Sequence, residues 1–411
     1  MTCIEFYPLQ AQSIKLSSYG FKPDDNRANF YNALKNNDTL IVDRQNTEWL
    51  VSPMTFRGLN NKTIIFEEGT TLRAKPGAFP KTNHCLMRFV QCENIEIIGN
   101  NALLKMNKEE YIDGEWRMGI SLVGCKNIKV NNLTVSSSGG DGIYIDGYKT
   151  QPYSENIYID NVISTNNKRQ GMSIISAKNV WVKNSIFTKT NGTLPEAGVD
   201  IEPDKDTNVI INVNFEHCSF IDNNHAGIVL GLNNLNEDSV PVSITFKDCY
   251  LSMNHDSSNR YPAAEIIVSS SSEQPVKGEV IFENIMIDGS EWGLMYTRKP
   301  SDAYSVIFKD LNAINICQRN EQSSVIYMEV PDYYKTSGPI GGFSLNDCYF
   351  EYDKEGPFLT VKGSSLGTLA GAKDITGNVT ISNPKLTEFI KYVKYNPQKN
   401  INLNIDFSVK E

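Results

Sequence analysis

The chain has 411 residues, a net charge of −9 at pH 7 and a sequence pI of about 5.2. With no cluster of Lys and Arg, this acidic balance argues against nucleic-acid binding, and no apolar run reaches the ~18 residues of a membrane-spanning helix. Glu5 and Pro8 interrupt the apolar run that a signal peptide would need, so the chain is expected to be cytoplasmic or to begin after a removed leader.

Residues 1–80 are predicted to form an N-terminal cap, with a short helix at 29–34 and strands at 40–42, 49–51 and 63–66. Two segments, Tyr19–Asp25 (YGFKPDD) and Ile65–Leu72 (IFEEGTTL), resemble the cap of pectate-lyase-like β-helix proteins and phage tailspikes. The resemblance implies a right-handed parallel β-helix. Physical reasoning agrees, because the open end of a solenoid needs such a cover.

Residues 81–385 are predicted to form the β-helix itself, because one strand pattern recurs along them. Within 139–231, a Gly followed by alternating apolar and polar residues occurs four times, at Gly142, Gly171, Gly198 and Gly227. These glycines are 29, 27 and 29 residues apart, and alternation with period two is typical of a strand. The expected inward pairs are Ile143/Ile145, Met172/Ile174, Val199/Ile201 and Ile228/Leu230.

A second strand column ends each time in a polar turn residue. Asx residues tolerate the left-handed backbone of a tight turn, and coils stacked ~4.8 Å apart would align them as a ladder. His217 belongs to this ladder and is interpreted as structural. The turn positions are Asn132, Asn161, Asn184, His217, Asp248, Asn284, Asp310 and Asp347.

These features predict an all-β fold: a single-stranded right-handed parallel β-helix of about ten coils, closed by a C-terminal cap at 386–411. A β-propeller would repeat every 40–45 residues or so, and the Leu/Asn signature of a leucine-rich repeat does not occur. The eight cysteines include no CxxC. They are expected to be small core residues, with a disulfide or metal site as the alternative.

The catalytic carboxylates are predicted to be Asp200 and Glu202, on the outer face of the third Gly-column strand. Residues two apart on a strand are about 6.5–7 Å apart, and glycosidases use carboxylate pairs about 5–5.5 Å (retaining) or 6.5–9.5 Å (inverting) apart. The alternative is that both residues merely solvate the strand. The expected outward row on successive coils is Arg88, Ser121, Tyr144, Ser173, Asp200, Val229 and Glu265; the next is Val90, Val123, Asp146, Ile175, Glu202, Gly231 and Ile267.

Other residues are assigned supporting roles around this pair. Asp146 and His225 are candidate catalytic groups, since a His near neutral pH can act as acid or base. Arg169 is expected to bind a carboxylate or sulfate, or to form a salt bridge with Glu196 or Asp200. The remaining substrate-binding candidates are Lys168, Gln170, Tyr144, Arg88, Trp116 and Glu265, with Tyr153 as a further aromatic and His255 and Arg260 in an approach loop.

No cofactor is expected, although Asp200, Glu202 and Asp204 together could bind a calcium ion. Extra residues collect on either side of the Gly-column strands and should wall one face of the solenoid. These expected loops are 105–117, 148–153, 190–196, 233–240 and 254–262.

The segment Arg169–Pro203 resembles a stretch found in bacterial β-helix proteins assigned to polysaccharide breakdown. The resemblance implies a secreted or periplasmic carbohydrate-active enzyme with a glycan substrate, acting as a monomer or a homo-oligomer such as a trimer. The polygalacturonase motifs NTD, DD, GHG and RIK are not found. A glycoside hydrolase is the first hypothesis; a polysaccharide lyase or epimerase acting on a uronate, or a non-catalytic glycan-binding protein, is the alternative.

Overall fold

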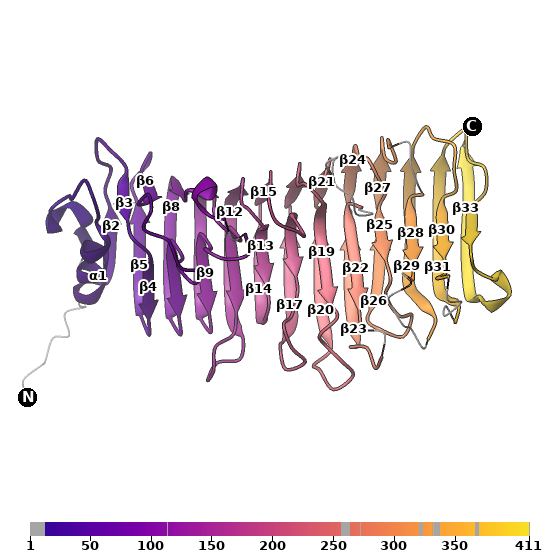
Figure 1. The fold of residues 1–411 in the computed structure, drawn as a ribbon, viewed down its shortest axis with the longest axis horizontal. Helices are drawn as coiled ribbons and strands as arrows, with labels where there is room; N and C mark the ends of the chain where they lie inside the picture. Colours follow the sequence, from indigo (N-terminus) through magenta and orange to yellow (C-terminus); the bar gives the residue numbers. More distant parts are fainter. Residues whose placement is uncertain are drawn as a thin grey trace, which may run out of the picture.

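The computed structural model describes residues 13–112, 114–255, 264–271, 273–319, 324–330, 332, 338–365 and 370–410. They form an elongated solenoid whose coils are stacked along the long axis, with α1 (Arg27–Asn36) at one end and β33 (Ile401–Lys410) at the other (Figure 1). All strand pairings between coils are parallel in the described residues, as a β-helix requires.

One sheet receives a single strand from each coil. In the described part of the chain it has twelve strands, which pair in chain order. They are β4 (Met54–Arg57), β7 (Met87–Val90), β9 (Ile120–Val123), β11 (Ile143–Asp146), β13 (Gln170–Ile174), β16 (Ala197–Ile201), β19 (Ala226–Leu232), β22 (Ile266–Ser270), β25 (Met295–Thr297), β28 (Ile326–Glu329), β30 (Leu359–Lys362) and β32 (Ile390–Val393).

A larger sheet of twenty-one described strands covers the other faces. Its first strands are β1 (Ser13–Lys15), β2 (Thr39–Val42), β3 (Trp49–Val51), β5 (Asn60–Phe66), β6 (Thr71–Ala74), β8 (Glu93–Lys105), β10 (Lys126–Ser136), β12 (Ser154–Thr165), β14 (Ala177–Lys183) and β15 (Ile186–Thr188). It continues with β17 (Ile210–Glu216), β18 (Ser219–Ile221), β20 (Val242–Lys247), β21 (Tyr250–Ser252), β23 (Gly278–Glu283), β24 (Met286–Asp288), β26 (Ser305–Lys309), β27 (Asn312–Ile314), β29 (Ile340–Glu351), β31 (Ala372–Ser382) and β33 (Ile401–Lys410).

The only α-helix of the described residues, α1 (Arg27–Asn36), lies at the N-terminal end of the stack (Figure 1). It buries Phe30, Ala33 and Leu34, and so covers apolar side chains that the first coil would otherwise expose. Three short 3₁₀ segments occur elsewhere, at Leu16–Tyr19, Lys108–Glu110 and Pro397–Lys399. None of the described helices is both long and apolar enough to cross a membrane.

The fold class is confirmed, but the number of coils is higher than the ten or so expected. The two outermost strands of the smaller sheet, β4 and β32, lie within 1–80 and 386–411, the ranges assigned to the caps. Both pair in register with their neighbours β7 and β30. Neither strand follows a column glycine, so the Gly pattern did not mark them.

The eight predicted turn residues all adopt the left-handed conformation, with φ between 48° and 54°. Asn132, for example, lies where the register between β10 and β8 shifts, between Asn131 and Leu133. Asn161 donates a hydrogen bond to Asn132 on the previous coil, with a distance of 2.6 Å. His217 has φ 53° and an exposed side chain, in agreement with its structural interpretation.

Each glycine of the Gly column marks a close approach between coils. A Cβ at Gly142, Gly171 or Gly198 would lie less than 3.0 Å from the carbonyl oxygen of the following glycine in the column, a distance that real Cβ atoms essentially never show. The Cβ positions of these glycines also meet core side chains such as Phe220. The residue before each glycine therefore lies on the outer face, where Ala197 packs with Ala226, Val229 and Ile267 outside the main core.

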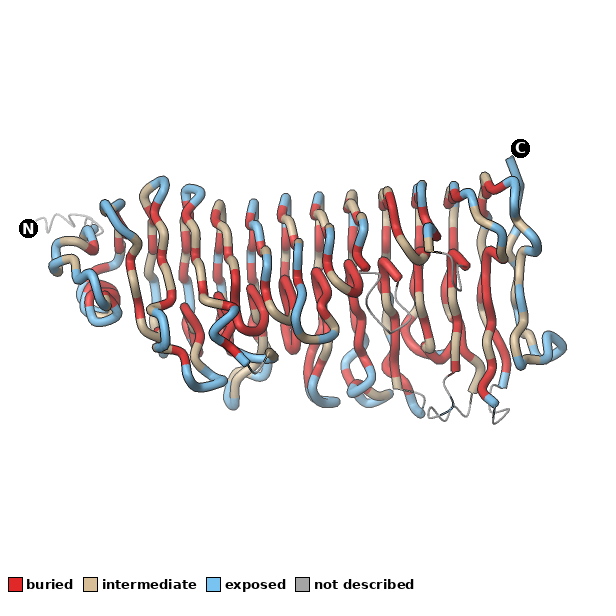
Figure 2. The backbone as a smooth tube through the Cα atoms, turned by 45° about the horizontal axis from the view of Figure 1, so that its top comes forward, coloured by how far each residue is buried: buried red, intermediate tan, exposed pale blue. Residues whose placement is uncertain are grey.

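The core is a continuous column of apolar side chains. All eight predicted inward residues are buried, and four phenylalanines stack with centroids 4.8–5.0 Å apart, Phe215, Phe246, Phe282 and Phe308. The seven described cysteines are buried and free, as expected for core residues; Cys3 lies outside the described residues. Figure 2 shows buried and less buried residues alternating along the strands.

Candidate active site

The register of the smaller sheet confirms most of the predicted outward row. Ser121 pairs with Arg88 and Tyr144, Ser173 pairs with Tyr144 and Asp200, and Asp200 pairs with Val229. Six coils therefore bring these side chains, including that of Asp200, onto one face.

The predicted alignment is wrong by two residues at Glu265. Val229 pairs with Ile267 and Gly231 pairs with Ser269, so Ile267 belongs to the first row. Glu265 takes the place of the missing column glycine, where a side chain enters the core. It is fully buried and accepts a hydrogen bond from Asn254 Nδ2 at 2.5 Å, and burial raises its pKa to about 7.

Asp200 is held in a fixed orientation. Gln170 Nε2 donates a hydrogen bond to Asp200 Oδ2 at 2.8 Å, and Gln170 Oε1 accepts one from the backbone N–H of Ala197. Although Asp200 faces outward from the strand, it is 0% exposed. The alternative interpretation, that Asp200 merely solvates the strand, is therefore wrong, because its carboxyl is buried beside Gln170 and Arg169.

Arg169 is the centre of the cluster. Its Nη2 lies 2.9 Å from Glu202 Oε2 and 4.0 Å from Asp200 Oδ2, and its Nη1 lies 3.9 Å from Asp141 Oδ1. The predicted Arg169–Asp200 contact is present, but the shortest ion pair is with Glu202. Asp141 and Asp200 are buried, whereas the Glu202 side chain is 43% exposed, so Glu202 forms the accessible edge of the cluster.

One guanidinium cannot balance three ionised carboxyls in a buried site. Burial raises the pKa of Asp141 to about 7, against the opposing attraction of Arg169. Burial, followed by the charge of Glu202, raises the pKa of Asp200 well above its usual value. The cluster therefore holds protonated carboxyl groups close to neutral pH, beside the ion pair of Arg169 and Glu202.

Asp141 was not among the site residues predicted from the sequence. It precedes its column glycine, at the position that Gln170 and Ala197 occupy on the next two coils. These positions face outward because the glycine approaches the next coil closely. Aligning the residues that precede the column glycines would have placed Asp141 next to Gln170.

Five buried polar atoms of this cluster have no hydrogen-bond partner among the described residues. They are Asp141 Oδ1 and Oδ2, Arg169 Nε, Ser173 Oγ and Asp200 Oδ1. Buried polar atoms are nearly always paired, and a group of exceptions in one place calls for an explanation such as a catalytic role or a bound polar ligand. This concentration is the strongest sign that the Arg169 cluster is functional.

Asp146 lies on the same face but makes different contacts. It accepts hydrogen bonds from Tyr144 Oη at 3.1 Å and from the backbone N–H of Gly147 at 2.6 Å. Burial raises the pKa of Asp146, with a smaller contribution from the negative charge of Asp204. Tyr144 and Asp146 thus form a polar pair two coils before Asp200 and Glu202.

The approach loops join into a wall beside these strands. Lys168 donates a hydrogen bond to the Tyr111 carbonyl, and Thr193 N–H donates to the Lys168 carbonyl at 2.8 Å. Lys168 therefore holds two loops together, and Trp116 in the first of them is 46% exposed. His225 Nδ1 lies 2.9 Å from the Pro195 carbonyl oxygen, so His225 supports the second loop.

The other predicted residues lie farther from the cluster. Arg88 is half-buried on β7, four strands from Asp200. His255 Nδ1 contacts Glu291 at 3.1 Å, while Arg260 and most of the loop 254–262 lie outside the described residues. The described carboxylates of Asp200, Glu202 and Asp204 do not form a compact set of cation ligands. Ligand atoms within 4.8 Å of one another occur instead at Glu216, His217 and Asp248.

Arg169 already supplies the positive charge that a calcium ion would bring to the cluster. Calcium binding stays a prediction for this site.

The protein-family model described as a right-handed β-helix region matches residues 41–215 of this chain and, in an overlapping match, residues 93–285. Together these ranges span more than half of the chain. The chain belongs to the right-handed β-helix family. A segment of 149 residues is 32% identical to the uncharacterized protein YclG of Bacillus subtilis, and it covers 32% of this chain and 26% of YclG. The match thus spans about a quarter of that relative's length.

Solved structures share this β-helix fold over almost the whole chain. The A-module of the Azotobacter vinelandii mannuronan C-5 epimerase AlgE6 has a TM-score of 0.64 and 13% identity, covering 97% of this chain and 99% of the module. The Streptococcus pneumoniae surface adhesin PfbA has a TM-score of 0.60 and 12% identity, with 97% and 93% covered. An exopolygalacturonase from Thermotoga maritima has a TM-score of 0.53 and 14% identity, with 94% and 91% covered. At these identities the likeness establishes the fold alone.

Proposed function

We propose that this β-helix protein is a glycoside hydrolase acting on a polysaccharide or complex glycan. The observation that carries the proposal is the pairing of a buried carboxyl of raised pKa, Asp200, with the exposed carboxylate Glu202 around one arginine. Two carboxyl groups in different environments are the usual means by which a glycosidase obtains an acid and a base from similar side chains.

In the proposed mechanism Asp200 is the general acid. Burial raises the pKa of its carboxyl and so favours the protonated form, and Gln170 donates its hydrogen bond to Oδ2, while Oδ1 has no hydrogen-bond partner in the described chain. Oδ1 is thus the atom available to protonate the glycosidic oxygen. Glu202, ionised in its pair with Arg169, is the base or nucleophile on the accessible side.

The separation of the two carboxyls fits this chemistry. Asp200 Oδ2 and Glu202 Oε2 lie 4.0 Å and 2.9 Å from the same Arg169 nitrogen, so they are at most about 7 Å apart. That limit includes the retaining range of about 5–5.5 Å and the lower end of the inverting range of about 6.5–9.5 Å. Sugar hydroxyls that replace the Arg169–Glu202 contact would uncover Asp200.

A second candidate is a lyase or epimerase acting on a uronate. Arg169 favours it, because a guanidinium beside the reacting sugar can neutralise a uronate carboxylate in a bidentate pair. The similarity of the fold to a mannuronan C-5 epimerase is consistent with this alternative. A non-catalytic glycan-binding protein is the third, supported by the likeness to an adhesin.

Incubation with a panel of neutral and uronate-containing polysaccharides distinguishes these candidates. Hydrolysis releases new reducing ends without ultraviolet absorbance. A lyase generates the absorbance of an unsaturated uronate, and an epimerase changes the proton NMR spectrum of the polymer without shortening it. Release of reducing ends without ultraviolet absorbance, lost in Asp200→Asn but kept in Asp206→Asn, supports the hydrolase. Binding without any product points to the glycan-binding protein.

A further inference from the structure

An exposed pair of aromatic rings lies on the larger sheet, away from the Arg169 cluster. Tyr158 on β12 and Trp181 on β14 occupy paired positions, and their rings stack with centroids 4.7 Å apart and planes within 7° of parallel. The phenylalanine stack of the core is buried, whereas Tyr158 is 40% exposed. Core packing therefore does not explain this pair.

The ring pair borders a groove of about 690 Å³ on the surface of the larger sheet. Lys129, which pairs with Tyr158 from the preceding strand β10, lies on one side. Asn131, Asp160 and Lys183 also line the groove. Since one face of the Tyr158 ring rests on Trp181, its other face is directed toward Lys129 and the groove.

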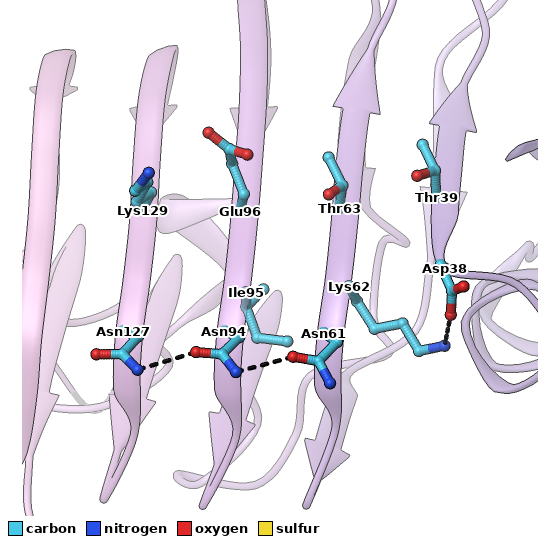
Figure 3. Close-up of a pocket in the computed structure, with 10 residues that line it drawn as sticks. All are labelled: Asp38, Thr39, Asn61, Lys62, Thr63, Asn94, Ile95, Glu96, Asn127 and Lys129. Carbon is cyan, nitrogen blue, oxygen red and sulfur yellow. Dashed lines mark hydrogen bonds and ion pairs between the residues drawn. The ribbon is translucent and has the colours of Figure 1, made fainter. Parts of the chain in front are cut away.

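A second groove of about 630 Å³ continues this one toward the N-terminal end, and Lys129 lines both. Figure 3 shows Lys129, Glu96 and Thr63 side by side on neighbouring strands, above a row of amide side chains. The register gives one continuous row through Thr63, Glu96, Lys129, Tyr158 and Trp181. These five strands span about 19 Å along the solenoid axis.

The row of asparagines below this groove is rigid. Asn127 donates to Asn94 at 2.9 Å, and Asn94 donates to Asn61 at 2.8 Å. All three have φ near 55°. Three of the side chains that line this groove are therefore held by hydrogen bonds before any ligand binds, which lowers the conformational cost of binding.

The charges around the groove are mixed in sign and partly paired. Lys183 forms an ion pair with Glu216 at 2.5 Å, and Asp160 accepts a hydrogen bond from Asn184 at 2.7 Å. Such a surface offers a polyanion no continuous positive path. It offers an aromatic face next to amides and charged groups, which suits a ligand with an apolar ring face and a rim of hydroxyls.

We propose that this surface is a second, non-catalytic binding site for a linear neutral glycan that runs along the solenoid axis. One sugar ring stacks on the free face of Tyr158, and its hydroxyls bond to Lys129, Asn131 and Asp160. Neighbouring sugars extend over Glu96 and Thr63. The site lies on a different sheet from Asp200 and does not depend on the proposed hydrolase.

Affinity electrophoresis in gels that contain one soluble polymer each tests the proposal. The probes are hydroxyethyl cellulose, xylan, a mixed-linkage β-glucan, alginate and polygalacturonate. We expect at least one neutral polymer to retard the native protein. The double substitution Tyr158→Ala and Trp181→Ala should raise the apparent Kd for that polymer about tenfold, the scale of losing an aromatic contact. Tyr349→Ala, on β29 of the same sheet, is the matched control and should keep the native affinity.

Lys129→Ala is a milder variant in case the double substitution alters folding, which circular dichroism would reveal. It should also weaken the binding of the same polymer. Failure of every neutral polymer to bind, or equal retardation of the native protein and both sets of variants, would overturn the proposal. Loss of catalysis in Asp200→Asn with unchanged retardation would separate the two sites, since only the Arg169 cluster is then affected.

Discussion

At the residue scale, the Arg169 cluster couples folding to pH. The pKa of Asp141 is about 7 in the folded protein, and burial is the main cause; an unfolded Asp titrates near 3.9. Between these values the folded state holds a proton that the unfolded state has lost. The contribution of Asp141 to stability therefore decreases as pH rises from about 4 to about 7, and stays level above that.

Replacing Asp141 by Asn should remove this dependence. The native protein should lose more free energy of unfolding between about pH 5 and pH 8 than Asp141→Asn does, as urea titrations at both values would measure. Asp206→Asn, at an exposed position, is the control and should follow the native protein. An Asp141→Asn curve parallel to the native one would contradict the raised pKa.

The two carboxyls of the proposed acid–base pair should respond differently to substitution. Asp200→Asn and Glu202→Gln are nearly isosteric, and an asparagine at position 200 can still accept the hydrogen bond from Gln170. Both variants should fold, with the turnover rate reduced at least about a hundredfold. An exogenous nucleophile such as azide should restore activity in Glu202→Gln alone, because only Glu202 is exposed.

Melting curves and product assays of both variants under the same conditions measure these outcomes. If both fold and turn over at nearly the native rate, Asp200 and Glu202 are not the catalytic pair.

At the element scale, the column glycines hold the coils at their close spacing. A Cβ on Gly171 would collide with the Gly198 carbonyl and press on Phe187 at 3.1 Å. The backbone carbonyl belongs to a paired strand and cannot move aside as a flexible side chain would. We expect Gly171→Ala to lower the free energy of unfolding by about 1–3 kcal/mol, the usual cost of overpacking.

Gly338→Ala is the matched control, because a Cβ there has nothing within 4 Å. Its effect on chemical denaturation should stay within about 0.5 kcal/mol. Equal stability of the two variants would show that the coils can separate enough to admit a methyl group at position 171.

The same glycines explain what could be predicted from the sequence. Where Gly142, Gly171, Gly198 and Gly227 occur, both the strands and the register were predicted correctly, because alternation and the turn residues agree. At the next coil Glu265 replaces the glycine, so the predicted strand was aligned with its neighbour two residues too early in the sequence. The full burial of Asp200 was not predicted either, because hydrophobic periodicity does not show which neighbouring side chains cover a residue on the outer face of a strand.

At the scale of the whole molecule, the solenoid turns one repeated position into a line of side chains. Beyond Asp200 the outward row continues through Val229, Ile267, Tyr296 and Tyr327. The rings of Tyr296 and Tyr327 are stacked with centroids 6.1 Å apart. Tyr327 also lines a cavity of about 310 Å³ together with Lys362 and Lys391. The spacing of strands puts these tyrosines about 14–19 Å from Asp200 along the axis.

A polymer bound at the Arg169 cluster and aligned with the axis would therefore reach Tyr296 and Tyr327, whereas a short oligosaccharide would not. Given the proposed hydrolase, the double substitution Tyr296→Ala and Tyr327→Ala should lower kcat/KM for the polymer several-fold. It should leave kcat/KM for a disaccharide or trisaccharide unchanged, because stacking on an aromatic ring contributes only where a sugar is present. Tyr349→Ala, on the other sheet, should alter neither value. An equal loss for long and short substrates would mean that the tyrosines support the fold, and no loss for either would mean that the polymer leaves the outward row before it reaches them.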